Sequence, residues 1–282
     1  MAGVYLYRDV QTGVDVAVKL LDARLLDNVA SGTARFTAEA KCLAGLNHPN
    51  VVPVFAAGTA GGFYWYAMEY CPAGTLRDAI KGRGGAPPQL AARWMFETLL
   101  GLQAVHQRGM IHRDIKPSNL LLAVDGRVRI ADFGIARHPR GQVPFRTISG
   151  SGMGSSGFAA PELQIDASTA DVRADLYSVG ATFYQVLTGI GPGNLMFMEV
   201  EPSVLDEVPA ELRAIIRTSI SPDMNDRYDN TYTMARALIS AIDAWATRTG
   251  AGVDAPAWLS EWGGPGLGGW LRGLAARLGI AA

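Results

Sequence analysis

The chain has little cysteine and little charge, and it lacks a long uninterrupted apolar segment. Only Cys42 and Cys71 occur in 282 residues, which excludes a disulfide framework or a cysteine-based zinc site and favours a reducing, cytoplasmic location. Charged residues make up 18% of the chain, against roughly 25% in an average protein, whereas apolar residues make up 49%. The composition therefore excludes disorder as the dominant state.

Neither sign of charge predominates, and no segment has the pattern of a membrane span. Lys and Arg number 25 and Asp and Glu 26, a net charge of -1, so bulk charge does not favour a nucleic-acid partner. The longest uncharged stretches, Cys42–Met68 and Leu176–Met198, are interrupted by glycine and proline. The first residues also lack the charged start and apolar run of a signal peptide.

The apolar pattern divides the chain into a strand-rich part and a helix-rich part. Alternating and β-branched runs predict strands, with one helix between the second and third, at Val4–Arg8, Val14–Leu20, Arg35–Leu46 (the helix), Val51–Ala57 and Phe63–Tyr70. Helical spacing then predicts Gln89–Gln107, Leu176–Thr188, Ala210–Thr218 and Thr231–Ala246. We therefore expect two units, 1–71 and 72–246, followed by a glycine-rich tail, 247–282.

Four short motifs carry residues of the kinds that bind phosphates and metal ions. They are Val16-Ala-Val-Lys19, His112-Arg-Asp-Ile-Lys-Pro-Ser-Asn119, Ala131-Asp-Phe-Gly134 and Ala160-Pro-Glu162. The first ends a predicted strand, and the others lie in loops. Each motif alone is weak evidence, because short motifs recur by chance, but their joint occurrence in this order is not accidental.

In these motifs the chain resembles the eukaryotic-type (Hanks-type) serine/threonine protein kinases, and the bacterial members in particular. The resemblance covers roughly residues 2–246. It implies an α+β, bilobal protein-kinase-like fold, with a small β-rich N-lobe that holds one main helix and a larger, mostly helical C-lobe. The implied reaction transfers the γ-phosphate of ATP to serine or threonine hydroxyls of protein substrates.

The resemblance implies a catalytic or metal-binding role for the polar residues of the loops. Phosphoryl transfer needs the phosphates held, their charge neutralised and the acceptor hydroxyl oriented. Asp114 would accept or orient the hydroxyl proton, and Lys116 would neutralise the γ-phosphate. Asn119 and Asp132 would bind Mg²⁺, a hard cation that takes oxygen ligands.

The nucleotide site that the resemblance implies draws on both lobes. Lys19, with Glu39 as its ion-pair partner, would bind the α- and β-phosphates; the alternative is that both are solvated surface charges. Val4, Ala17 and Leu121 would enclose the adenine ring. Glu69 and Cys71 are the remaining positions that the resemblance assigns to nucleotide binding.

Other matching positions would hold the site in place. The resemblance implies a stack of apolar side chains and His112, a buried aspartate that anchors the catalytic loop, and a structural ion pair; the residues concerned are Leu43, Val54, His112, Phe133, Asp175, Glu162 and Arg227. Ordinary core packing is an equally valid description of the stack.

The segment between Gly134 and Ala160 matches the family's activation segment. Arg113 directly before Asp114 marks the type in which a phosphate on this segment pairs with the loop arginine. The candidate acceptors are Thr147, Ser149 and Ser151; the alternative is a Ser/Gly loop that is phosphorylated only incidentally. Ser155 sits where the family has a threonine that bonds the catalytic loop.

The chain departs from the family pattern at its beginning and in one loop residue. Ala2-Gly3-Val4 aligns with the end of the family's G-x-G-x-x-G-x-V motif, whose first glycines and strand have no counterpart here. Either the protein starts upstream of Met1, or the chain is a weak enzyme or a pseudokinase that acts as a nucleotide-binding or scaffold module. Ser118 replaces a glutamate that reads basic substrates in many relatives. A small-molecule kinase is a third, weaker alternative.

The tail contains an amphipathic pattern. Within Leu267–Ile280, five large apolar residues fall at helical spacing, with Arg272 and Arg277 between them. The pattern predicts contact with a membrane surface or a partner through 267–280, or packing back onto the second lobe.

Overall fold

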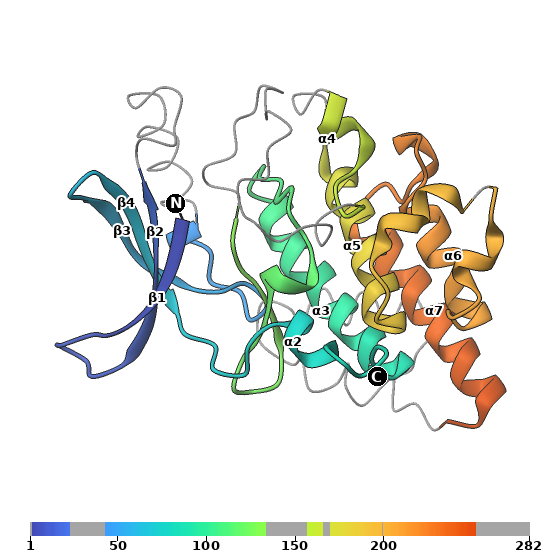
Figure 1. The fold of residues 1–282 in the computed structure, drawn as a ribbon, viewed down its shortest axis with the longest axis horizontal. Coiled ribbons are helices and arrows are strands. Elements are labelled where there is room, and N and C mark those ends of the chain that lie inside the picture. The colour runs from blue at the N-terminus through green and yellow to red at the C-terminus, as the bar shows by residue number, and fades with distance from the viewer. Residues whose placement is uncertain (1, 23–42, 134–156, 166–169, 199, 252–282) are drawn as a thin grey trace.

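A computed structural model describes residues 2–22, 43–133, 157–165, 170–198 and 200–251. The strands gather at one end of the molecule and the helices at the other (Figure 1), which confirms the expected α+β, two-lobed arrangement. Glu39, the hydroxyl residues of 134–156 and the tail from residue 252 lie outside the described residues.

The N-lobe sheet has four antiparallel strands in the order β1-β2-β4-β3. Their bounds are β1 Ala2–Arg8, β2 Asp15–Asp22, β3 Val54–Ala60 and β4 Phe63–Glu69. The β1–β2 turn forms because the Asp9 carboxylate accepts hydrogen bonds from the Gln11 N–H and the Thr12 hydroxyl, while Gly13 has a φ of 70°. The resulting register places Val4 opposite Lys19. The two predicted strands, Val4–Arg8 and Val14–Leu20, therefore pair as a hairpin.

Strand β1 is an edge of the described sheet. It pairs only with β2, and the side chains of Val4, Tyr5, Leu6 and Tyr7 are each more than half exposed. Among the described residues, β1 is therefore an exposed edge of the sheet.

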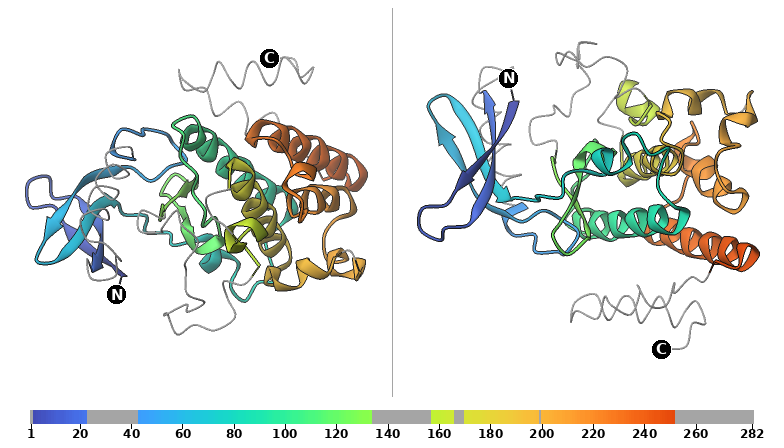
Figure 2. Two further views of the ribbon diagram at one scale, coloured as in Figure 1. Left: turned by 90° about the horizontal axis from the view of Figure 1, so that it is seen from above. Right: turned by 60° about the horizontal axis from the view of Figure 1, so that its bottom comes forward.

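The C-lobe is built around a buried helix. The helices are α2 Leu76–Ile80, α3 Pro88–His106, α4 Pro161–Ile165, α5 Val172–Thr188, α6 Ala210–Ser219 and α7 Thr231–Thr249. Every residue of α5 from Ala174 to Tyr184 is buried, between α3 and α6, which both pack against it. Figure 2 shows α3 and α7 side by side. No helix in the described ranges is long and apolar enough to cross a membrane.

Local signals set the helix ends. Asp171 caps the start of α5 by accepting from the Arg173 N–H, and Gly189 ends it at a φ of 72°. A capping box at Asn230 starts α7, which continues to Thr249, three residues beyond the predicted end. The sequence did not predict the single-turn helices α2 and α4, because five residues are too few to show a helical repeat.

Backbone hydrogen bonds connect residues 50–52, which precede β3 of the N-lobe, to a small sheet in the C-lobe. A two-stranded sheet, β5 Leu120–Leu122 and β6 Val128–Ile130, lies in the C-lobe. On its outer edge, Ile130 accepts from the Val52 N–H and donates to the Asn50 carbonyl, each at 2.9 Å. Val51 therefore bridges to β6 rather than opening β3, which corrects the predicted start of that strand at Val51 to Val54.

His48 supports the same segment and makes the fold sensitive to pH. Its Nδ1 accepts a hydrogen bond from the Asn50 N–H at 3.1 Å, and burial lowers its pKa from 6.5 to about 4. A group with a depressed folded pKa stabilises the fold above its unfolded pKa, and this stabilisation disappears as the pH falls. We expect the free energy of unfolding to decrease by about 1–3 kcal/mol between pH 6.5 and 4 through this group.

The measurement is urea unfolding at several pH values within that window for the wild type and for His48→Asn. The asparagine oxygen replaces Nδ1 as an acceptor but does not titrate, so the stability difference between the two proteins should change with pH. A difference that stays constant across the window contradicts the assignment.

Candidate active site

The loop of residues 112–119, called the catalytic loop below, brings Asp114, Lys116 and Asn119 into one contact network. Lys116 Nζ lies 3.1 and 3.0 Å from the two carboxylate oxygens of Asp114. Asn119 Nδ2 donates to Oδ2 of Asp114 at 2.9 Å and to its backbone carbonyl at 2.8 Å. The Asn119 amide therefore uses its donors on the loop, while its oxygen accepts only a long hydrogen bond from the Ser118 hydroxyl at 3.5 Å among the described residues. These three predicted positions are brought together.

Asp175 of α5 fixes the backbone of this loop. Its carboxylate accepts from the His112 N–H at 2.9 Å and from the Arg113 N–H at 2.7 Å, and His106 Nε2 lies 2.8 Å away. These contacts hold Arg113 at a φ of 64°, a conformation that non-glycine residues rarely adopt. Burial tends to raise the pKa of Asp175, but the hydrogen bonds and charges of His106 and His112 together outweigh it and lower that pKa.

Asp132 meets Lys19 across the two lobes. The Lys19 ammonium forms an ion pair with Oδ1 of Asp132, and Asp132 adopts a φ of 62°. Since Ala131 N–H donates to the Asn119 carbonyl at 2.9 Å, Asp132 follows directly on a residue bonded to the catalytic loop. Lysine, metal-ligand candidates and catalytic loop thus form a continuous set.

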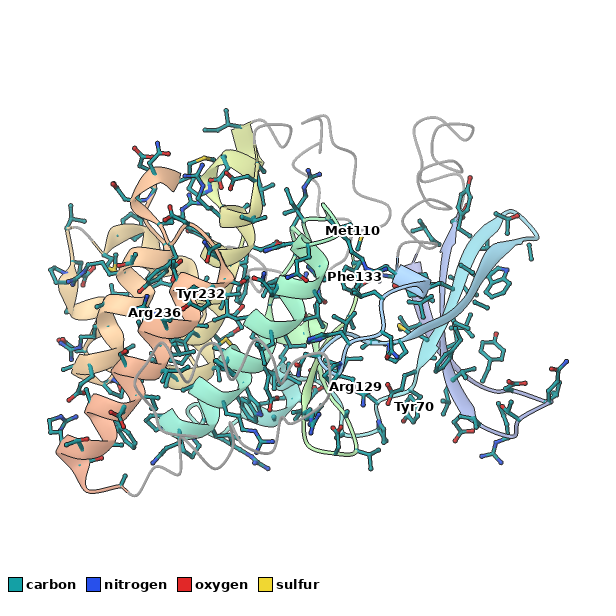
Figure 3. The ribbon with its side chains drawn as sticks, turned by 180° about the vertical axis from the view of Figure 1, so that it is seen from behind. Tyr70, Met110, Arg129, Phe133, Tyr232 and Arg236 are labelled. Carbon is teal, nitrogen blue, oxygen red and sulfur yellow. The ribbon has the colours of Figure 1, made fainter. Side chains whose placement is uncertain are left out.

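His112 and Phe133 connect the two loops through their rings. The ring centroids are 4.8 Å apart, with an interplanar angle of 60°, and His112 Nε2 lies 3.0 Å from the Ala131 carbonyl. Leu43 and Val54, the other members of the predicted stack, are buried in the same core. Phe133 lies at the junction of the lobes in Figure 3.

The predicted adenine-binding residues occupy positions on both lobes. In the sheet register Ala17 pairs with Leu6 of β1 and Met68 of β4 and is buried. Leu121 of β5 lies opposite Arg129 and bridges to Thr75. None of these contacts tests nucleotide binding, so for Val4, Ala17 and Leu121 this role stays a prediction.

Glu69 and Cys71 lie where the sheet leads into the C-lobe. The Glu69 carboxylate forms an ion pair with Arg129 of β6, a side chain labelled at the lobe junction in Figure 3. Burial, with a smaller contribution from the charge of Asp125, raises the pKa of the Cys71 thiol to about 11, so this thiol is unreactive at neutral pH. The structure thus gives Glu69 a contact between lobes that the sequence did not predict.

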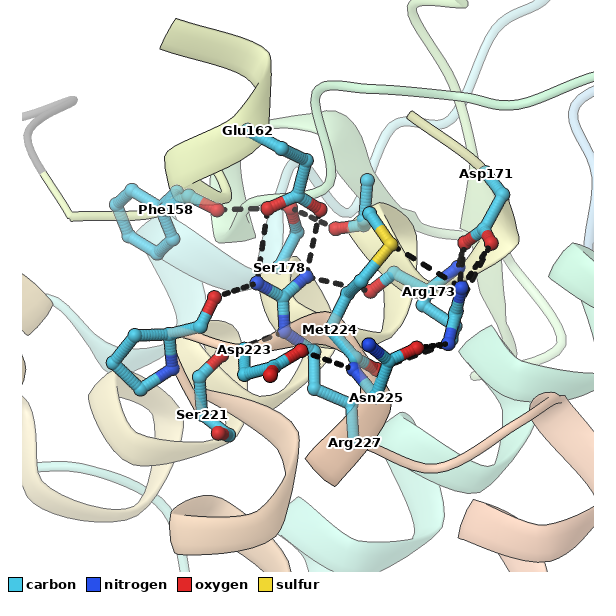
Figure 4. Close-up of polar contacts among 12 residues, drawn as sticks. Phe158, Glu162, Asp171, Arg173, Ser178, Ser221, Asp223, Met224, Asn225 and Arg227 are labelled. Carbon is cyan, nitrogen blue, oxygen red and sulfur yellow. Dashed lines mark hydrogen bonds and ion pairs between the residues drawn. The ribbon is translucent and has the colours of Figure 1, made fainter. Parts of the chain in front are cut away.

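Glu162 and Arg227 form the structural ion pair that the resemblance implied. Arg227 donates to both carboxylate oxygens at 2.7 and 2.9 Å, as Figure 4 shows. It also donates to the Ser221 carbonyl at 2.7 Å and lies over the Tyr177 ring. The Arg227 side chain is fully buried, so α4 is fixed to the body of the C-lobe.

The comparison with known protein families decides the classification. Residues 1–242 match the family described as the protein kinase domain. The chain belongs to the protein kinase family. This confirms the family that the four motifs indicated.

Similar proteins include bacterial serine/threonine kinases. PknB of Mycobacterium leprae is 34% identical over 85% of this chain, and PknL of Mycobacterium bovis is 33% identical over 83%. The chain spans 40% and 61% of those relatives' own length. A solved structure of Rad53 1-466 in complex with AMP-PNP shares the kinase fold, with a TM-score of 0.66 and 24% identity over 83% of this chain and 60% of that one.

Three residues around the site were missed by the sequence analysis. Asn50 and Glu97 hold strand β6, and Arg129 on that strand pairs with Glu69. Glu97 had one available signal, since it is the only charged residue between Trp94 and Val105. Asn50 and Arg129 carry none, because their partners are distant in sequence.

Proposed function

We propose that this chain is the catalytic domain of a serine/threonine protein kinase that uses ATP and Mg²⁺. One observation carries the proposal: Asp114, Lys116 and Asn119 share one contact network. A backbone hydrogen bond links Asn119 to Ala131, the residue before Asp132, and Asp132 forms an ion pair with Lys19. A scaffold has no physical need for all five groups in this arrangement.

The reaction follows from the position of each group. The serine or threonine oxygen of the substrate attacks the γ-phosphorus, the bond to the oxygen bridging the β- and γ-phosphates breaks, and ADP leaves. Asp114 accepts the hydroxyl proton. Lys116, already 3.0 Å from that carboxylate, lies beside the transferred group and balances its negative charge, while Lys19 binds the other phosphates.

Asn119 and Asp132 fit a magnesium ion. Both present oxygen, the ligand that Mg²⁺ prefers, and the buried Oδ1 of Asp132 is the atom that the Lys19 ammonium contacts. When bound, the ion neutralises phosphate charge. These side chains would hold it, and the Lys19 ammonium, which contacts Asp132 in the structure, would bind phosphate oxygens.

Regulation by phosphorylation of the activation segment belongs to the same proposal. The buried Nε of Arg113 has no hydrogen-bond partner among the described residues, and a phosphate on Thr147, Ser149 or Ser151 would supply one. Treating the protein with a phosphatase should then lower its activity, and alanine at the modified position should prevent recovery.

The function is tested with radiolabelled ATP and a generic protein substrate, followed by identification of the phosphorylated residues. We expect phosphoserine and phosphothreonine. ATP binding without transfer would favour the alternative, a pseudokinase that acts as a nucleotide-binding module.

Replacing Lys19 tests the nucleotide site separately. Lys19→Met removes a charge-assisted contact to phosphate, so we expect the KM for ATP to rise roughly 10- to 100-fold. Lys81→Met, at an exposed lysine after α2, is the matched control and should leave the KM unchanged. Equal KM values for both variants contradict the role of Lys19.

A further inference from the structure

Glu97 is a carboxylate in a fully buried position near the middle of α3. None of its surface is exposed. One carboxylate oxygen accepts from Arg93 Nε, one turn earlier, at 2.9 Å, and the other accepts from the Val128 N–H of β6 at 2.7 Å. It therefore links the long helix of the C-lobe to the first residue of that strand.

Burial of this carboxylate opposes the stability of the helix. Removing a charge from water is unfavourable even when it is paired, and burial raises the pKa of Glu97 above its ordinary value. Arg93, whose side chain is 30% exposed, offsets only part of that cost. An apolar side chain would avoid the cost of the charge but would leave the buried Val128 N–H without an acceptor, so the role of the carboxylate lies in that hydrogen bond.

The reason lies in the open edge of β6. This strand has three residues and pairs with β5 on one side, while on the other side Ile130 forms only an isolated bridge to Val51. On the other side the Val128 N–H donates to Glu97, its carbonyl accepts from Asn50 Nδ2 at 2.8 Å, and Ile130 bonds to the 50–52 segment. The N–H and carbonyl groups of Val128 and Ile130 on that edge are thus all hydrogen-bonded. Glu97 is the partner that comes from a helix of the C-lobe.

Strand β6 leads directly to the metal-ligand candidate. Only Ala131 separates Ile130 from Asp132, so a displacement of β6 is passed on to the Asp132 carboxylate. An error of about 1 Å in the placement of such a group is enough to cost on the order of 10²-fold in rate. We propose that Glu97 is a positioning residue, which through Val128 and β6 places Asp132 for magnesium binding. This inference rests on the proposed kinase function.

Two conservative variants of Glu97 distinguish the effect of side-chain length from the effect of charge. Glu97→Gln keeps the length of the side chain and an acceptor oxygen but loses the charge. Glu97→Asp keeps the charge, but its side chain is one methylene shorter. Its carboxylate therefore either pulls Val128 toward α3 or loses the hydrogen bond from the Val128 N–H. A positioning role predicts that Asp is the damaging change, whereas a role in charge balance predicts that Gln is.

The measurement is the affinity for ADP with and without Mg²⁺, which requires no catalysis. We expect Glu97→Asp to raise the Mg²⁺ concentration for half-maximal ADP binding about 10-fold, as loss of an outer-shell contact does in metal sites. Glu97→Gln should remain within about threefold of the wild type, below that range, and ADP binding without Mg²⁺ should be equal in all three. Arg93→Gln, which spares the Val128 bond, is the control and should lower thermal stability without changing the Mg²⁺ requirement.

The outcomes distinguish this inference from the proposed function. If the wild type binds ADP with Mg²⁺ and Glu97→Asp needs no more Mg²⁺ than Glu97→Gln, the positioning role is wrong and the kinase function stands. If the wild type shows no Mg²⁺-dependent ADP binding, both fail.

Discussion

Asp114→Asn should lower kcat by about 10²–10⁴-fold while nucleotide affinity stays close to that of the wild type. Asparagine has nearly the same shape as aspartate, and its single oxygen, in the place of Oδ2, can accept from both Lys116 and Asn119. It cannot accept the hydroxyl proton, and it removes the negative charge that Lys116 balances. Phosphate transfer under saturating ATP, together with ADP binding, measures the two effects separately.

The matched control is Asp206→Asn, which makes the same chemical change at a carboxylate 68% exposed and paired with Arg213 on the C-lobe surface. It should retain full activity. A decrease of less than tenfold for Asp114→Asn, in a protein that still binds ADP, contradicts the role of Asp114 as proton acceptor.

Glu162→Ala should destabilise the C-lobe by about 3–5 kcal/mol, because it leaves the fully buried Arg227 guanidinium without its anion. At about 2–4 °C per kcal/mol for a lobe of this size, the thermal midpoint should fall by roughly 6–20 °C. The other bonds of Arg227, to backbone carbonyls such as that of Ser221, satisfy its donors but not its charge. Scanning calorimetry measures the effect directly.

Glu211→Ala provides the comparison for this loss. Glu211 also pairs with an arginine, Arg248, but that side chain is 58% exposed, so water replaces the lost contact and the expected cost is below about 1 kcal/mol. Equal midpoints for the two variants would show that burial of Arg227 adds nothing to the ion pair.

The helices and strands were largely predictable where the sequence repeats a pattern. The helices α3, α5, α6 and α7 and the two strands of the first hairpin lie within a few residues of their predicted bounds, because their apolar residues follow a helical or strand repeat. The start of β3 was wrong. Val51 has the composition of a strand residue, but its backbone partner is Ile130, almost 80 positions away, and no local pattern indicates such a pairing.

The candidate site shows the same division. Asp114, Lys116 and Asn119 are close in sequence, and short-range hydrogen bonds hold them together, so a motif was sufficient to find them. Glu97 and Arg129 act through partners 31 and 60 residues away, and neither belongs to a motif. Their contacts depend on tertiary packing, of α3 against β6 for Glu97 and of β4 against β6 for Arg129.

The order of residues alone determined which chemical groups the chain can apply to a phosphate, because the motif residues keep their spacing whatever the rest of the fold does. The tertiary structure decided which groups hold those residues in place. Whether a carboxylate such as Glu97 is solvated on a helix surface or buried against a strand depends on long-range packing, and that packing sets both the cost of its charge and the contact it makes.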